Sequence, residues 1–484
     1  MKKNVKANYV YNLLYQLLTI ILPIITIPYL ARTLGSEGNG IYGYTLSIAT
    51  YFTLIGSLGI ALYGQREIAY CQDNRIKRSK VFWELNIIKF ITMIISIIVF
   101  YFVYARSGEY AIYYKILLLE LFASIIDISW FYQGMEEFKT IVLRNYIIRM
   151  ICLFCIFIFI KTPSDTWKYV LIFSGSTLLG NLSLWINLSK KISLIAIKKL
   201  NIKKHIKPIL LLFIPQIAIQ LYTVLDKSMI GMITNNMSEV AYYDQAQKVI
   251  KTLMTVITSI STVMLPRIAA CYANNDKKRI KEYMNNSFKF IFMVSFPMIF
   301  GIIAVSDSFV PFFFGNGYDK IKIVMPLLSV IILFISMSIM IAQLLLSTKQ
   351  TKKYTISVVS GAIINFVLNL ILIYYFKSIG ACIATIIAEF SIAAIDLYFI
   401  RSKFNIFEII KSSKNYFLLS IVMFFVIYPF GYLQFSNMLT MVIQISIGGI
   451  LYIIGLFIIK DEFFIDLYNN VINYIKNKLK ISSN

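Results

Sequence analysis

Apolar residues occur along the chain in runs of about 20 positions, and short polar segments separate these runs. A helix of about 20 apolar residues crosses the roughly 30 Å of hydrocarbon in a bilayer and satisfies its own backbone hydrogen bonds there. The pattern therefore predicts an all-α, polytopic membrane protein with about fourteen transmembrane helices. Their expected bounds, good to a few residues, are 9–31, 41–64, 84–104, 111–134, 141–160, 168–189, 208–234, 246–271, 287–314, 323–347, 355–376, 378–400, 415–433 and 438–459.

The composition supports the same class of protein. Of the 484 residues, 58% are hydrophobic and only 14% are charged, whereas soluble proteins carry about 25% charged residues. The formal net charge of +24 would suggest nucleic-acid binding in a soluble protein, but here its distribution explains it. With the amino terminus inside, the inner segments hold 31 of the 47 Lys and Arg residues and the outer loops hold 6. This asymmetry predicts cytoplasmic termini, and no nucleic-acid partner is expected.

The longest polar break, Lys190 to Lys207, carries seven lysines and divides the spans into six, six and two. We therefore expect an amino-terminal six-helix lobe with its basic linker (1–207), a second six-helix lobe (208–414), and two extra spans with a cytoplasmic tail (415–484). Six spans per lobe give both lobes the same orientation, as in parallel repeats. A short internal sequence similarity supports the repeat. Gly40-Ile41-Tyr42 opens the second span of the first lobe, and Val240-Ala241-Tyr242 opens the second span of the second lobe.

The basic linker has two interpretations. We expect a solvated amphipathic helix, in which His205, the chain's single histidine, is a solvated loop residue. The alternative is that the linker lies on the anionic inner leaflet and gathers anionic lipid, because such a surface attracts nearby cations.

Charged residues inside spans are costly, so they usually face a partner or a water-filled path. Arg149, Lys227 and Lys251 lie well within spans of both lobes. If the lobes face each other, these cations meet across one cavity, which would suit an anion such as a phosphate attached to sugars. Asp226 either neutralises Lys227 or bridges to the fourth or fifth span. Together with Asp226, the candidates for gating or ion coupling are Glu120, Asp127, Glu389 and Asp396.

Enzymatic activity is not expected from this chain. The outer loops are short, and the largest, Asn235 to Gln245, contains only Glu239 and Asp244 as carboxylates. A membrane acyltransferase would need a buried histidine, and none is expected. The five cysteines are an odd number in spans or on the inner side, so neither a disulfide framework nor a metal site is predicted, and no cofactor is implied.

Five motifs follow one another along the chain. They are PYLARTLG with the adjoining GIYGY (28–44), YGQREIA (63–69), WFYQGMEEFK (130–139), DKSMIG (226–231) and MLPRIA (264–269). In this order, and on this pattern of spans, the sequence resembles the Wzx-type polysaccharide repeat-unit flippases of the multidrug/oligosaccharidyl-lipid/polysaccharide (MOP) exporter superfamily. The resemblance covers essentially the whole chain.

The resemblance implies a fold, a cargo and candidate residues. Two lobes would form a V around a central cavity and alternate between inward-open and outward-open states. The cargo would be an undecaprenyl-diphosphate-linked oligosaccharide, moved from the inner to the outer leaflet of the bacterial plasma membrane for capsule or O-antigen synthesis. Arg32, Lys227 and Arg267 match motif positions that would handle the anion or the gates. Membrane lipids, a polysaccharide polymerase and glycosyltransferases are the implied partners.

Two other functions stay open at this point. Flipping of a lipid-linked peptidoglycan precursor is chemically close to the first function. A multidrug-type antiporter is less consistent with the sequence, because such relatives often use an acidic residue in the first span and the span 9–31 has none.

Overall fold

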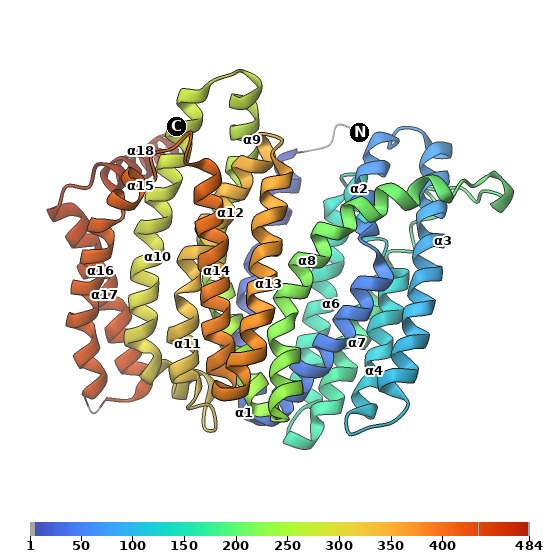
Figure 1. The fold of residues 1–484 in the computed structure, drawn as a ribbon, viewed down its shortest axis with the longest axis horizontal. Coiled ribbons are helices and arrows are strands. Elements are labelled where there is room, and N and C mark those ends of the chain that lie inside the picture. Colours follow the sequence, from blue (N-terminus) through green and yellow to red (C-terminus); the bar gives the residue numbers. More distant parts are fainter. Residues whose placement is uncertain (1–4, 434, 483–484) are drawn as a thin grey trace. The chain divides into compact units, whose positions relative to one another are not determined.

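The computed structural model describes residues 5–433 and 435–482, and within them every regular element is a helix (Figure 1). The first helices are α1 (Val5–Ser57), α2 (Ile60–Tyr70), α3 (Arg75–Phe100), α4 (Ala111–Ile126), α5 (Ser129–Gly134), α6 (Phe138–Phe159), α7 (Thr166–Ser183) and α8 (Lys203–Thr234). The others are α9 (Met237–Ala273), α10 (Lys277–Phe314), α11 (Ile321–Ser329), α12 (Ile331–Ser347), α13 (Thr351–Phe376), α14 (Ser378–Ile400), α15 (Ile406–Ser412), α16 (Lys414–Ile427), α17 (Asn437–Ile458) and α18 (Glu462–Ser482). Short helical turns are η1 (Tyr101–Ala105), η2 (Pro163–Asp165), η3 (Ile197–Lys199) and η4 (Tyr428–Tyr432).

The predicted spans coincide with these helices. Each of the fourteen falls on one or two helices, so the all-helical prediction is confirmed. Some bounds are wrong by nine or ten residues, because α3, α9 and α10 begin well before the apolar runs that they contain. Among the described residues, ten stretches are long and apolar enough to cross a membrane. The first of these stretches, Leu22–Tyr70, contains the end of the first predicted span and all of the second, because a bend at Gly35, and not a loop, separates the two helical segments of α1. The chain is a multi-pass membrane protein.

The described residues form two compact units. The first comprises Met1–Gln245 with Phe366–Ala381, and the second comprises Ala246–Asn365 with Cys382–Asn484. This division follows packing and not span number, because α8 and the start of α9 pack with α1 in the first unit. The division into 1–207, 208–414 and 415–484 stays a prediction about the repeat.

The first unit has two apolar clusters along its helices. One joins α1, α3, α4 and α7 through side chains such as Leu34, Phe100, Leu117 and Val170. The other lies around the aromatic residues Phe82 and Trp130 and includes Ile209 at the start of α8. The second cluster therefore connects the beginning of α8 with α3 and α5.

In the second unit, the two helices after the expected repeats pack on α10. The side chain of Gln444 in α17 is fully buried. Its Nε2 donates to the carbonyl oxygens of Ala304 (3.2 Å) and Ile427 (3.1 Å), and its Oε1 accepts from Ser308 Oγ (3.0 Å). Because an unpaired amide inside an apolar bundle would be costly, this network specifies how α10, α16 and α17 pack together.

The basic linker between α7 and α8 is not the expected solvated amphipathic helix. Most of residues 184–202 form turns and irregular backbone, and the three-residue turn η3 is the regular element among them. Arg75 Nη2 donates to the carbonyl oxygens of Ser189 (3.1 Å) and Ile192 (3.2 Å). Trp83 Nε1 donates to Ser193 O (3.1 Å). Side chains of α3 thus fix the linker through hydrogen bonds to its backbone carbonyl groups.

His205 is also not the solvated residue that we expected, because only 2% of it is exposed. Its Nε2 lies 2.8 Å from Glu84 Oε2, and its Nδ1 lies 2.8 Å from the hydroxyl of Tyr63. The fully buried carboxylate of Glu84 also accepts from Asn201 N (2.6 Å) and pairs with Lys204 Nζ (2.9 Å). We call this set of five residues the Glu84 cluster. It joins the first turn of α8 to α2 and α3.

Candidate functional site

The helical hairpin of α8 and α9 packs along the second half of α1 in the first unit. Three side-chain contacts cross this junction. Ser36 Oγ lies 2.9 Å from Ser238 Oγ, Gln245 Nε2 donates to Asn39 Oδ1 at 3.2 Å, and Tyr51 OH lies 2.6 Å from Ser228 Oγ. We call this junction the polar seam; its residues are Ser36, Asn39, Gly40, Gly43, Tyr44 and Tyr51 of α1 and Lys227, Ser228, Gly231, Met237, Ser238, Asp244 and Gln245 of the hairpin.

Glycines allow the helices of the polar seam to approach closely. A Cβ atom at Gly40 would lie 1.7 Å from the carbonyl oxygen of Met237. A Cβ atom at Gly231 would lie 2.3 Å from the ring of Tyr44. These glycines belong to the GIYGY and DKSMIG motifs, and both occupy positions where any side chain would separate the helices.

The two segments that share the internal sequence similarity lie at this junction. Residues 40–42 and residues 240–242 open equivalent spans, and Gly43 of the first segment faces Val240 and Asp244 of the second. A hydrogen bond between Ser36 and Ser238 extends the same pairing. Two segments that the predicted repeat would make equivalent therefore contact each other.

One ion pair lies within the polar seam. Lys227 Nζ is 3.0 Å from Asp244 Oδ1, and their side chains are 17% and 3% exposed. We had expected Asp226 to neutralise Lys227 or to bridge to the fourth or fifth span. That expectation is wrong for Lys227, because adjacent residues on a helix point in different directions. Asp226, 2% exposed, instead accepts hydrogen bonds from Tyr243 and from Asn369 Nδ2, the latter at 2.6 Å.

A further buried carboxylate lies at the start of α9. Glu239 is 5% exposed, and its Oε2 accepts hydrogen bonds from Ser378 Oγ (2.6 Å) and Ser378 N (3.2 Å). Sequence reasoning missed the participation of Glu239, Asp244, Tyr243 and Asn369. The sequence did contain a signal for Glu239 and Asp244. Two carboxylates in a short segment between apolar runs need hydrogen-bond or ion-pair partners when that segment is buried.

Arg32 is an exposed residue of α1, three positions before a bend. The bend is at Gly35, whose φ of +70° and ψ of −178° leave the helical region. These angles favour glycine because it has no Cβ atom. Arg32 thus lies at the end of the first straight segment of α1, as the sequence predicts for a residue at a helix end.

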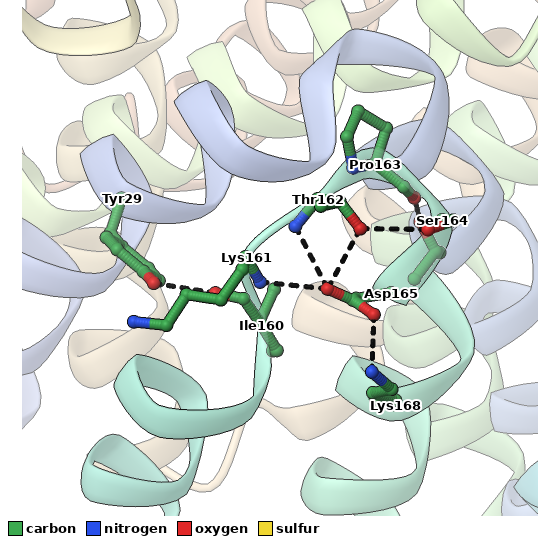
Figure 2. Close-up of polar contacts among 9 residues, drawn as sticks. Tyr29, Ile160, Lys161, Thr162, Pro163, Ser164, Asp165 and Lys168 are labelled. Atoms are coloured by element: carbon green, nitrogen blue, oxygen red, sulfur yellow. Dashed lines mark hydrogen bonds and ion pairs between the residues drawn. The ribbon is translucent and has the colours of Figure 1, made fainter.

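The loop between α6 and α7 packs against this bend (Figure 2). Tyr29 OH donates to Ile160 O at 2.6 Å, and a Cβ atom at Gly38 would lie 2.5 Å from Thr166 Oγ1. Asp165 Oδ2 accepts from the backbone N–H groups of Lys161 and Thr162, both at 2.9 Å. Lys168 Nζ pairs with Asp165 Oδ1 at 2.6 Å. A well-bonded loop therefore fixes the segment that presents Arg32.

The remaining candidate residues of the first unit have different environments. Asp127 ends α4; its Oδ1 accepts from Ser129 N (2.9 Å), and its carbonyl oxygen accepts from Lys89 Nζ (2.7 Å), which is a structural arrangement. Glu120 in α4 has a buried Oε2 atom that forms no hydrogen bond within the described part of the chain. Arg149 is half-buried in α6.

The other four candidates belong to the second unit. Lys251 and Arg267 are exposed residues of α9, whereas Glu389 and Asp396 in α14 are 5% and 1% exposed. Asp396 Oδ1 makes no hydrogen bond to any described residue. The expectation that Arg149, Lys227 and Lys251 line one cavity stays a prediction.

Comparison with known proteins identifies similar sequences. The family model described as "Polysaccharide biosynthesis protein" matches residues 5–272, and the model described as "Lipid II flippase MurJ" matches residues 148–448. The putative O-antigen transporter of Escherichia coli K12 is 25% identical over 407 residues, which cover 83% of this chain and 98% of that protein. The lipid II flippase MurJ of Thermosipho africanus is 28% identical over 202 residues, 40% of each chain.

Solved structures resemble this fold. The lipid II flippase MurJ in an inward closed conformation superposes with a TM-score of 0.76 at 20% identity, over 96% of this chain and 99% of that one. A MATE-family multidrug transporter of the MOP superfamily in an inward-facing conformation gives 0.61 at 15% identity, over 82% and 99%. At these identities the likeness extends to the fold alone.

Proposed function

Because the chain belongs to the polysaccharide biosynthesis protein family, we propose that it is a flippase for lipid-linked oligosaccharides. It would move undecaprenyl-diphosphate-linked repeat units from the inner to the outer leaflet of the bacterial plasma membrane for capsule or O-antigen synthesis. The observation that carries this proposal is the Lys227–Asp244 pair within a junction of hydrogen bonds and close glycine contacts. Such a junction lacks interlocking side chains at its glycines and can separate. An anion that competes for Lys227 would release Asp244, the side chain that faces Gly43 of α1.

The proposal includes an orientation. Helix α8 has 32 residues, which correspond to about 48 Å and exceed the roughly 30 Å of membrane hydrocarbon. The polar seam and the basic linker lie at opposite ends of α8. The seven lysines of the linker favour the cytoplasmic side, so the polar seam would face outward and would close the outer gate.

The proposed roles follow this orientation. Arg32, Arg149, Lys227, Lys251 and Arg267 would contact the diphosphate in turn as the gates alternate. A guanidinium group binds a phosphate through two parallel hydrogen bonds, and an ammonium group acts as a point charge.

The acidic candidates divide by their environment. Glu120, Asp226, Glu389 and Asp396 would serve gating or ion coupling, because buried carboxylates respond to a proton or cation. Asp127 would keep the break between α4 and α5 in place. This scheme makes the protein a transporter without enzymatic activity, and a polymerase and glycosyltransferases would act before and after it.

A second candidate function is flipping of a lipid-linked peptidoglycan precursor. The match of residues 148–448 to the MurJ family model favours it. Both cargoes carry a diphosphate on a polyprenol. The cationic residues would therefore suit either cargo, and they do not favour one of the two flippase functions over the other. A multidrug-type antiporter has only the shared fold in its favour.

The test is mass spectrometry of polyprenyl-linked glycans from a strain that lacks this protein, combined with their leaflet accessibility. Complete repeat units trapped on the inner leaflet would support the oligosaccharide flippase and identify the cargo. Trapped peptidoglycan precursor would favour the second candidate. Normal outward display of both glycans would contradict both flippase functions. Complementation with the wild-type chain is the control.

A further inference from the structure

Part of the basic linker projects away from the helices of the first unit. Residues 194–200, Leu-Ile-Ala-Ile-Lys-Lys-Leu, extend past α3 as a loop, green at the right of Figure 1. We call this segment the projecting loop. Five of its seven residues are large aliphatic or alanine side chains, and Leu194 is 88% exposed.

Both ends of the projecting loop are fixed. Just before it, Ser193 O accepts from Trp83 Nε1 (3.1 Å), and Ser193 N donates to Ser79 Oγ (2.8 Å). Just after it, Asn201 N donates to the buried Glu84 Oε1 (2.6 Å). The exposure of Leu194 and Ala196 is therefore maintained by hydrogen bonds to α3 on either side of the loop.

The charge of this region is positive throughout. Residues 184–207 contain seven lysines and no Asp or Glu. Two of the lysines form ion pairs, Lys191 with Glu137 and Lys204 with Glu84. Lys198 and Lys199 in the projecting loop are exposed and form no ion pair with a described residue. The loop therefore combines apolar side chains with unneutralised positive charge.

The exposed apolar side chains of the neighbouring helix α3 indicate the environment of the projecting loop. On α3, Phe90, Ile91, Ile95 and Ile98 are each at least half exposed, as is typical of a face in contact with acyl chains. Trp83 lies two turns before these residues, and tryptophan is enriched at membrane interfaces. We therefore expect the loop held by Trp83 to lie where acyl chains give way to headgroups.

From this arrangement we infer that the projecting loop is a lipid-binding element, which inserts Leu194 and its apolar neighbours into the bilayer interface and holds anionic phospholipid headgroups with Lys198 and Lys199. Apolar side chains next to lysines are the combination that interfacial anchors use. A protein partner with an acidic surface would satisfy the lysines, but it would compete with the lipid that already surrounds α3. This inference goes beyond the proposed transport function and does not depend on it.

The first test measures lipid affinity. The purified full chain in detergent is titrated with phosphatidylglycerol or phosphatidylcholine, and bound lipid is counted by native mass spectrometry. The double variant K198Q/K199Q should lose about 30-fold in apparent affinity for phosphatidylglycerol, the factor expected for two cations at an anionic surface. The matched control K277Q/K278Q removes an equally exposed adjacent pair at the start of α10 and should change little. An equal loss in both variants, or no loss in the first, would overturn the inference.

The second test identifies what Leu194 contacts. A photoreactive p-benzoylphenylalanine replaces Leu194 in the full chain, and membranes from expressing cells are irradiated. The expected product is a covalent adduct with phospholipid. An adduct with another protein as the main product would show that the loop docks a protein instead. No adduct with either, at normal expression, would place the loop in water and would also overturn the inference.

Discussion

Lys227 and Asp244 form an ion pair of 3.0 Å between the two helices of the α8–α9 hairpin, on the side that packs against α1. The lysine is neighbour to Asp226 in sequence, yet its partner is 17 residues away. A lysine that is 17% exposed and pairs with one carboxylate is suited to exchange, because an incoming phosphate can replace the carboxylate.

The first prediction concerns this pair. Lys227→Ala and Asp244→Ala should each lower export at least tenfold. Asp244→Ala should also lower the free energy of unfolding by about 2 kcal/mol, because it leaves a partly buried ammonium group unpaired. The exchanged variant K227D/D244K should recover part of the thermal stability but not export. Recovery of export as well would mean that the pair is structural only.

The second prediction tests the close contact at Gly40. Gly40→Ala should lower the free energy of unfolding by about 3 kcal/mol and impair export, because the new Cβ atom meets the backbone of Met237. The control is Gly175→Ala in α7, where a Cβ atom has no neighbour within 4 Å. Its stability should stay constant or rise by up to about 1 kcal/mol. Thermal unfolding and surface-polysaccharide assays measure both effects, and similar results for the two variants would contradict the role of the polar seam.

The third prediction concerns the Glu84 cluster. His205→Ala should lower the free energy of unfolding by about 3 kcal/mol, because the buried Glu84 carboxylate and the Tyr63 hydroxyl each lose a partner. Lys204→Ala removes another partner of the same carboxylate, but the lysine side chain is 44% exposed. Its effect should stay below about 1 kcal/mol. Equal losses of thermal stability in the two variants would show that the burial of His205 does not make its contribution to the stability of the protein larger than that of Lys204.

The fourth prediction addresses Arg32. Arg32→Ala should reduce export at least tenfold at normal protein levels, and Arg32→Lys should retain an intermediate activity, because a lysine keeps the charge but loses the two-pronged geometry. Immunoblotting controls for expression. Unchanged export in the alanine variant would assign Arg32 a purely interfacial position at the bend of α1.

Much of the fold could be predicted because it depends on local apolar content. Every run of about 20 apolar residues became helical, and the glycine-rich segment after Arg32 marks the bend at Gly35. A bend of this kind has a sequence signal, since glycine tolerates positive φ.

The docked linker had no comparable signal. Its contacts from Arg75 and Trp83 end on backbone carbonyl oxygens, which every residue carries, so the lysine-rich sequence alone indicated a solvated segment. The sequence did not predict the hydrogen-bond partners of Asp226 for another reason. Asn369 lies 143 residues away, and such long-range pairing cannot be read from spacing on one helix.

The position of Glu84 also affects how the protein is made. Its buried carboxylate bonds to residues 117 and 121 positions later in the chain, and at 5–20 residues per second the ribosome needs roughly ten seconds to reach them. During this interval a carboxylate that is later buried faces the aqueous interface. An amino-terminal half that ended at residue 190 would keep that exposed charge permanently. When the chain is expressed as two polypeptides divided at residue 190, the second piece carries residues 201–205, and we therefore expect the two pieces to associate in part through the bonds of these residues to Glu84.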